Sequence, residues 1–168
     1  MSDALNRLAA VVGEKHAIRD AAEMDGYMRE WRQIWTGRSP LVLRPGSTEE
    51  VSRILAIANE TRTAIVPQGG NTGLVVGGVP DDSGTQVVLS MTRMSAVRAI
   101  DPANLTITVE AGCVLQNLQA AAENAGFLFP LSLGAEGSCT IGGNLGTNAG
   151  GTQVVRYGNT RDLCLGLE

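Results

Sequence analysis

The chain has little of what builds disulfide frameworks, metal sites or histidine-based active sites. Its 168 residues include three cysteines and a single histidine, His16. Because the cysteines are odd in number and form no C-x-x-C pair, a disulfide framework and a structural zinc site are both disfavoured. We expect no bound metal, a solvated helical His16, and three free, buried thiols in a reducing cytoplasm. The cysteines are Cys113, Cys139 and Cys164.

Clustered positive charge and long apolar runs are also missing. Asp and Glu number 17 against 13 Lys and Arg, which gives a formal net charge of −4, and the basic residues gather nowhere. This balance disfavours nucleic acid and anionic membranes as partners. No apolar run approaches the roughly 20 residues that span a bilayer, and the first residues, 1–7, do not read as a secretory signal. We therefore expect a cytoplasmic protein without a transmembrane segment.

Three standard ligand-binding motifs are absent. The chain contains no Gly-Lys pair, which excludes a Walker loop, and no window satisfies the G-x-G-x-x-G spacing of the Rossmann fingerprint. EF-hand and H-E-x-x-H patterns do not occur either. A nucleotide bound by this chain is therefore held in some other way.

Glycine, in contrast, is abundant, with 21 residues that concentrate in two stretches, 67–78 and 134–151. Backbone without a Cβ can approach a ligand closely and aim several N–H groups at one place. Hydroxyl and amide side chains interleave with the glycines, while Lys and Arg are absent from both stretches. This pattern predicts a dipolar cradle for the phosphates of a dinucleotide. The alternative is a flexible surface loop followed by a set of tight turns.

Hydrophobic periodicity predicts an α+β fold rather than a regular alternation of strands and helices. Ser47 to Glu50 forms a capping box ahead of a helix, and 105–110 alternates as a half-buried antiparallel strand does. Segment 21–35 remains ambiguous. We expect two lobes, 1–67 and 68–168, divided near residues 67–71. Helices are expected at 4–12, 47–58 and 114–122, and strands at 41–44, 64–67, 87–90, 97–100, 105–110 and 127–130.

The two glycine stretches, taken with Arg156-Tyr-Gly-Asn-Thr-Arg-Asp-Leu-Cys-Leu-Gly-Leu-Glu168, closely resemble the FAD-binding domain of the vanillyl-alcohol-oxidase/PCMH flavoprotein superfamily. Within it, the likeness is greatest to D-2-hydroxyglutarate and D-lactate dehydrogenases. The resemblance implies a PCMH-type domain of two small α+β subdomains with FAD between them. It also implies that the domain is C-terminally incomplete and that the substrate domain is absent.

The resemblance carries a set of cofactor-binding residues onto this sequence. The first group would hold the FAD pyrophosphate, largely through backbone N–H groups, and comprises Gly69, Gly70, Asn71, Thr72 and Gly73. The second group would line the cofactor from the other side, and comprises Gly134, Ser138, Gly143, Asn144 and Thr147. Asn71 stands where covalent relatives carry a flavin-linked histidine, so FAD is expected to be bound non-covalently. Cys139, near a second linkage position, is expected to be an ordinary buried thiol and Glu136 a solvated carboxylate.

The chemistry implied by the resemblance is oxidation of a D-2-hydroxy acid to the 2-oxo acid, with hydride transfer to flavin and electrons passed to an external acceptor. Catalytic residues are not identified in this chain. A metal and the substrate-binding residues would belong to the missing substrate domain, so this portion alone is expected to be inactive. The resemblance leaves room for a homodimer. Two alternatives stay open: another branch, such as an alditol oxidase or a cell-wall-precursor reductase, and a non-catalytic nucleotide-binding module.

Overall fold

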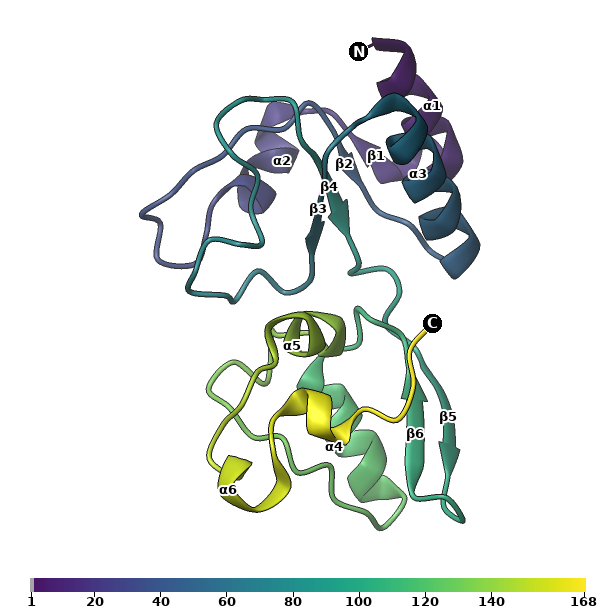
Figure 1. Cartoon of the computed structure of the whole chain (residues 1–168), viewed down its shortest axis with the longest axis vertical. Coiled ribbons are helices and arrows are strands. Elements are labelled where there is room, and N and C mark those ends of the chain that lie inside the picture. The colour runs from purple at the N-terminus through teal and green to yellow at the C-terminus, as the bar shows by residue number, and fades with distance from the viewer. Residues whose placement is uncertain (1) are drawn as a thin grey trace. The chain divides into compact units, whose positions relative to one another are not determined.

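The computed structural model describes residues 2–168, which form a first unit ending at Met94 and a second unit, Ser95–Glu168 (Figure 1). The sequence placed this division near residues 67–71. The difference arises because β3 (Ile65–Gln68) pairs in parallel along its whole length with β4 (Val87–Ser90). The first glycine stretch connects these two neighbouring strands, so it lies inside the first unit.

The first unit is built on a four-stranded sheet with the order β1-β2-β4-β3. β2 (Val42–Leu43) and β3 run parallel to β4, whereas β1 (Ala17–Ile18) is antiparallel to β2. All three parallel strands therefore end at the same edge of the sheet, where the glycine stretch begins. The helices of this unit are α1 (Ser2–Val12), α2 (Ala21–Met28) and α3 (Thr48–Thr61), with a short 3-10 helix η1 (Glu14–His16).

Strand alternation divides the core of the first unit between the two faces of its sheet. Leu41 and Leu43 point to the face that packs on α1 and α3, which lie side by side (Figure 1). Val42, between them, points to the face that packs on Met24 and Met28 of α2. Both faces are thus covered by helices, as is usual for parallel strands. Full burial of one such aliphatic side chain contributes about 1.5–3 kcal/mol.

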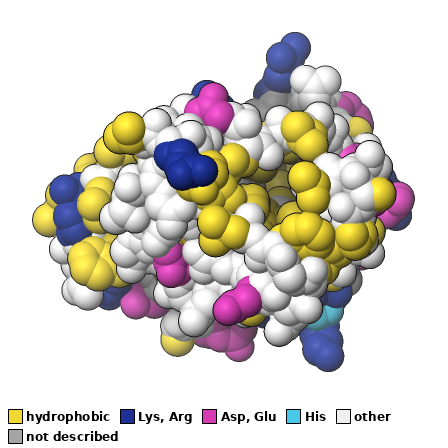
Figure 2. All heavy atoms as spheres, turned by 90° about the horizontal axis from the view of Figure 1, so that it is seen from below, with side chains coloured by type: hydrophobic (Ala, Val, Ile, Leu, Met, Phe, Trp, Pro, Cys, Tyr) yellow, Lys and Arg dark blue, Asp and Glu magenta, His cyan; other side chains and the backbone are white. Residues whose placement is uncertain are grey.

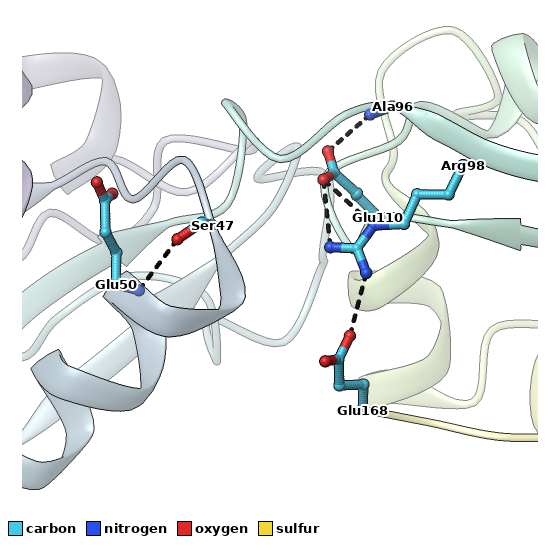
Figure 3. Close-up of polar contacts among 6 residues, drawn as sticks. All are labelled: Ser47, Glu50, Ala96, Arg98, Glu110 and Glu168. Atoms are coloured by element: carbon cyan, nitrogen blue, oxygen red, sulfur yellow. Dashed lines mark hydrogen bonds and ion pairs between the residues drawn. The ribbon is translucent and has the colours of Figure 1, made fainter.

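The capping box predicted at Ser47 is present in a modified form. Ser47 Oγ accepts the Glu50 N–H at 3.2 Å (Figure 3), which satisfies one of the unpaired amides at the start of α3. The Glu50 carboxylate accepts the N–H of Gly46 at 2.7 Å, one residue before the cap. The β2–α3 turn is therefore closed from both sides.

The second unit contains an antiparallel hairpin of β5 (Val97–Asp101) and β6 (Thr106–Val109), which confirms the expected half-buried antiparallel strand. Arg98 on β5 binds two carboxylates, those of Glu110 at 3.3 Å and Glu168 at 3.1 Å (Figure 3). The remaining elements are α4 (Leu115–Asn124), α5 (Ile141–Thr147), α6 (Val154–Tyr157) and the 3-10 helix η2 (Thr160–Leu163).

An apolar groove of about 190 Å³ lies between this hairpin and the end of α4. It is lined by Ile100, Leu105, Ile107, Phe127, Leu128 and Phe129, among others. Leu105 and Leu128, which line this groove, are largely exposed. Figure 2 shows hydrophobic side chains gathered around a hollow on the face that it draws.

Two local predictions were wrong. Residues 127–130 form no strand, since no neighbouring strand is available to pair with them, although Phe129 packs into the core of the second unit. His16 is not a solvated helix residue. It ends η1 half-buried, and its buried Nδ1 has no hydrogen-bond partner among residues 2–168. Burial and the nearby Arg93 lower the pKa of His16. The three cysteines are free, as expected, and only Cys164 is half-exposed.

Candidate functional site

The first glycine stretch forms a loop, residues 69–78, that leaves the carboxyl end of β3 and returns toward β4. Within the described chain, no backbone N–H of this loop donates a hydrogen bond to a protein acceptor. Backbone donors are usually paired, so a run of unpaired N–H groups at the end of a parallel strand is the arrangement that anions use. Carboxyl ends of parallel strands are also where ligands of open α/β sheets bind. We name this segment the glycine loop.

The glycine loop is held in place through its carbonyls and not through its N–H groups. Gln68, buried at the end of β3, donates from Nε2 to the carbonyls of Gly78 at 2.6 Å and Tyr27 at 2.9 Å. Arg32 donates from Nη2 to the carbonyl of Leu74 at 2.6 Å. These anchors keep the loop in one conformation while its amide protons stay available to a ligand.

Asn71 has a structural task within the glycine loop. Its φ of 51° lies in the left-handed region, which asparagine tolerates better than most residues with a side chain. Its side-chain amide donates to the carbonyl of Arg29 at 2.7 Å and approaches that of Gly26 at 3.4 Å. The side chain therefore fastens the loop to the segment after α2. A hydrogen bond donated by Asn71 to a cofactor would therefore come from its backbone N–H.

A groove of about 350 Å³ lies beside the returning half of the glycine loop. Its wall includes Trp35, whose indole Nε1 donates to the carbonyl of Pro80 at 3.2 Å. Gly37 is required nearby, because a Cβ at that position would collide with the same carbonyl. The other lining residues are Ile65, Val66, Pro67, Val76, Gly77, Val79, Asp81 and Gln86.

The second glycine stretch forms a short helix, α5, which the sequence reasoning did not predict because Gly142, Gly143 and Gly146 are poor helix formers. Tertiary contacts override that preference. The N–H of Gly142 donates to the carbonyl of Ala111 at 2.8 Å, and a Cβ on Gly142 would lie 2.8 Å from the Ala111 Cβ. The glycine thus allows α5 to approach the turn that follows β6.

Two polar groups near the start of α5 lack a hydrogen-bond partner within the described residues. They are the exposed N–H of Gly143 and the buried hydroxyl of Thr140, which is 3% exposed as a residue. Burying a hydroxyl without a partner is costly, so such a group points to an unseen polar contact. Thr140 was not among the predicted site residues. Its place directly before the first apolar residue of a helix, which is typical of an N-cap, is the signal that could have found it.

The five predicted residues of the second glycine stretch differ in their exposure to solvent. Gly134 and Ser138 are exposed on the loop before α5, and Gly143 and Thr147 are exposed on the helix itself. The Thr147 hydroxyl donates back to the carbonyl of Gly143 at 2.9 Å. Asn144 is buried, and its Nδ2 lies 3.6 Å from Cys139 Sγ. Their binding of a cofactor stays a prediction, as it does for the five residues of the glycine loop.

Cys139 is an inert thiol in this environment. It is 3% exposed and packs with Leu115 and Leu131. Burial raises the pKa of Cys139, which keeps the sulfur in its poorly nucleophilic thiol form. The expectation of an ordinary buried thiol agrees with this geometry.

Glu136 is not the solvated carboxylate expected from the sequence. It is half-buried, and its Oε1 accepts the N–H of Leu133 at 3.0 Å. Hydrogen bonds from the side chains of Ser132 and Gln119 lower the pKa of Glu136. The carboxylate therefore holds the loop that leads into α5, and a proton-transfer role is disfavoured by its low pKa.

The donor set of both glycine stretches fits a cofactor with a diphosphate. The glycine loop offers backbone N–H groups, and the start of α5 offers the N–H of the exposed Gly143. Neither stretch places a Lys or Arg side chain among these donors. Dipoles of this kind bind phosphate oxygens without burying an unpaired charge.

Comparison with known proteins decides the family. Residues 39–168 match the family described as "FAD binding domain". The chain belongs to this FAD-binding domain family. The resemblance to the vanillyl-alcohol-oxidase/PCMH superfamily and the α+β fold are thereby confirmed, and FAD is the cofactor of this domain family.

Relatives and solved structures agree with this assignment. The chain is 49% identical over 139 residues to the D-2-hydroxyglutarate dehydrogenase, mitochondrial, of Danio rerio. That match covers 83% of this chain and 26% of the Danio rerio protein. It is 42% identical over 158 residues to the D-2-hydroxyglutarate dehydrogenase, mitochondrial, of Arabidopsis thaliana. That match covers 94% of this chain and 28% of the Arabidopsis protein. A structure of alkyldihydroxyacetonephosphate synthase superposes with a TM-score of 0.88 at 22% identity. The superposition covers 98% of this chain and 32% of the synthase chain. The chain thus spans less than a third of the length of these proteins.

The relatives do not support the cytoplasmic location expected from the sequence, because both are named as mitochondrial proteins. Across residues 2–168, no helix has the length and apolar character needed to cross a membrane.

Proposed function

We propose that this chain is the FAD-binding portion of an oxidoreductase that oxidises a D-2-hydroxy acid, of the D-2-hydroxyglutarate or D-lactate type, to the 2-oxo acid. The observation that carries the proposal is the glycine loop, whose N–H groups have no acceptor among the described residues while the carbonyls of Leu74 and Gly78 are anchored. The names of the relatives supply the substrate class.

The predicted cofactor residues belong to this proposal. The backbone of Gly69, Gly70 and Thr72 would donate to the FAD diphosphate, and the backbone of Gly143 would donate to the cofactor. The exposed Ser138 would add a hydroxyl. Binding would be non-covalent, because Asn71 stands in place of a flavin-linked histidine and the Cys139 thiol is buried.

Bound FAD would supply the hydride acceptor, and the residues of this chain would hold and orient it. The substrate carboxylates and any metal would be bound by parts of the protein outside this chain. The expected partners are therefore a small 2-hydroxy acid and an external electron acceptor. We also propose that this portion alone does not turn over substrate.

An anaerobic visible spectrum of the full-length protein that contains this portion tests the proposal, recorded before and after addition of D-2-hydroxyglutarate. A flavin spectrum that bleaches supports both cofactor and substrate class. A flavin that stays oxidised with D-2-hydroxyglutarate and D-lactate, but bleaches with an alditol, assigns the protein to another branch of the superfamily. Absence of flavin, even after incubation with FAD, contradicts the proposal. Acid precipitation should release the flavin into the supernatant, since no covalent link is expected.

The compartment and the oligomeric state complete the proposal. The sequence favours the cytoplasm and leaves room for a homodimer. Cell fractionation tests the first, with recovery in mitochondria as the contradicting result. Sedimentation of the purified protein tests the second.

A further inference from the structure

A buried carboxylate holds the turn that faces the glycine loop. Glu30 is 2% exposed and is the one charged residue buried to this degree in the described chain. Its two oxygens accept the N–H groups of Arg32 at 2.8 Å and Ile34 at 2.7 Å. A charge is retained in such a place only when hydrogen bonds and a partner charge offset its desolvation. The Arg32 guanidinium, 3.6 Å away, supplies that partner charge.

The turn held by Glu30 is not a relaxed one. Gln33, at its tip, has a φ of 59°, a left-handed conformation that costs a residue with a side chain of order 1 kcal/mol or more. The backbone closes the turn with Gln33 N–H to Glu30 carbonyl at 2.9 Å. An unfavourable conformation that is fixed by a buried charge indicates that the position of this turn matters to something outside it.

Arg32 transmits the position of the turn to the glycine loop. Its Nη2 donates to the carbonyl of Leu74 at 2.6 Å, across 42 positions of sequence. In a planar trans peptide the carbonyl and the following N–H point in opposite directions. Holding the Leu74 carbonyl against Arg32 therefore turns the N–H of Val75 away from the turn, toward whatever the loop binds.

We propose that Glu30 and Arg32 are positioning residues of the FAD-binding loop. Glu30 fixes the turn, and Arg32 uses that fixed turn to hold the Leu74 carbonyl, so that the amides of the glycine loop are oriented before the cofactor arrives. Preorganised donors bind more tightly because less ordering remains at the moment of binding. This inference rests on the proposed function, in which the glycine loop binds the FAD diphosphate.

The test compares Arg32→Met, Arg32→Lys and Arg53→Met by titration with FAD, followed through flavin fluorescence. Arg32→Met should raise the FAD Kd by about tenfold, the effect of losing one charge-assisted hydrogen bond. Arg32→Lys keeps a donor and should recover most of the affinity. Arg53→Met removes the same charge from an exposed position of α3 and should leave the Kd unchanged.

Hydrogen exchange separates positioning from general stability. In the chain without FAD, Arg32→Met should speed exchange of the 69–78 amides at least severalfold and leave exchange of α1 and α3 unchanged. An unchanged Kd and unchanged loop exchange in Arg32→Met overturn the inference, as does an equal loss of affinity in Arg53→Met. If the unsubstituted chain binds no FAD, the proposed function itself fails, and with it this inference.

Glu30→Gln tests whether Glu30 acts on the glycine loop by fixing the turn that carries Arg32. It should raise the FAD Kd in the unsubstituted background and have little further effect in Arg32→Met, because both changes act through the same contact. Additive effects of the two changes would contradict a shared pathway.

Discussion

The guanidinium of Arg161 lies at the carboxyl end of α5, where its Nε donates to the carbonyl of Leu145 at 2.8 Å. A second nitrogen donates to the carbonyl of Gly146 at 2.8 Å. The last carbonyls of a helix have no partner within the helix, so a basic side chain there both pairs them and favours the helix dipole. The second glycine stretch thus depends on a residue outside it.

Replacement of Arg161 should loosen α5. We expect Arg161→Met to lower the free energy of unfolding by about 1 kcal/mol, since two carbonyls lose a charge-assisted donor. Urea denaturation measures this loss, and exchange of the amides in 145–149 should rise. Arg156→Met, which alters an exposed arginine of α6, is the control. Equal exchange in the two variants would argue against the capping role.

Two glycines of α5 should respond in opposite ways to alanine. Gly142→Ala places a Cβ against Ala111 and should cost about 1–3 kcal/mol of stability. Gly146→Ala meets no atom within 4 Å and should stabilise by up to about 1 kcal/mol, through higher helix propensity. Thermal unfolding of both variants tests the pair. A harmless Gly142→Ala would show that α5 does not need its close approach.

Asn71 should prove more tolerant of glycine than of alanine. Asn71→Gly keeps the left-handed backbone but loses the bond to Arg29, whereas Asn71→Ala also strains the backbone. We expect the FAD Kd to rise by about tenfold in Asn71→Gly and further in Asn71→Ala. Fluorescence titration gives both values. Equal affinities in all three proteins would show that the side chain does not fasten the loop.

Glu30 should make stability depend on pH in a defined direction. Burial opposes its ionisation, but the N–H groups of Arg32 and Ile34 and the Arg32 charge outweigh that effect and lower the pKa of Glu30. A lowered pKa stabilises the fold above the ordinary glutamate value, about 4.3, and this stability is lost as pH falls through the lowered value. Glu30→Gln should therefore be less stable than the unsubstituted chain at pH 7, and the gap should narrow at acid pH.

The control for this pH series is Glu123→Gln, which removes an exposed carboxylate of α4. Its stability should follow that of the unsubstituted chain at every pH. If the difference in free energy of unfolding between Glu30→Gln and the unsubstituted chain widens toward acid pH, the lowered pKa assigned to Glu30 is contradicted.

Local signals identified most elements of this fold. Ser47 caps α3, the alternation at 105–110 marks β6, and Gly126 follows α4 with a φ of 83°. Local signals failed at segments whose secondary structure depends on contacts with residues distant in the sequence. Phe127 to Pro130 has the composition of a strand but finds no strand to pair with, and α5 forms because Gly142 meets Ala111.

The sequence by itself determined the family, the two glycine-rich stretches and the absence of Lys and Arg within them, because these depend on residue type and spacing alone. Only the tertiary structure decided how the first stretch is held. Glu30 and Arg32 lie far from this stretch in the sequence, Gln68 lies at its start, and none of the three has a sequence pattern that marks an anchor. Anchoring depends on which carbonyl lies within hydrogen-bond distance of which donor, and packing of the whole unit sets that distance.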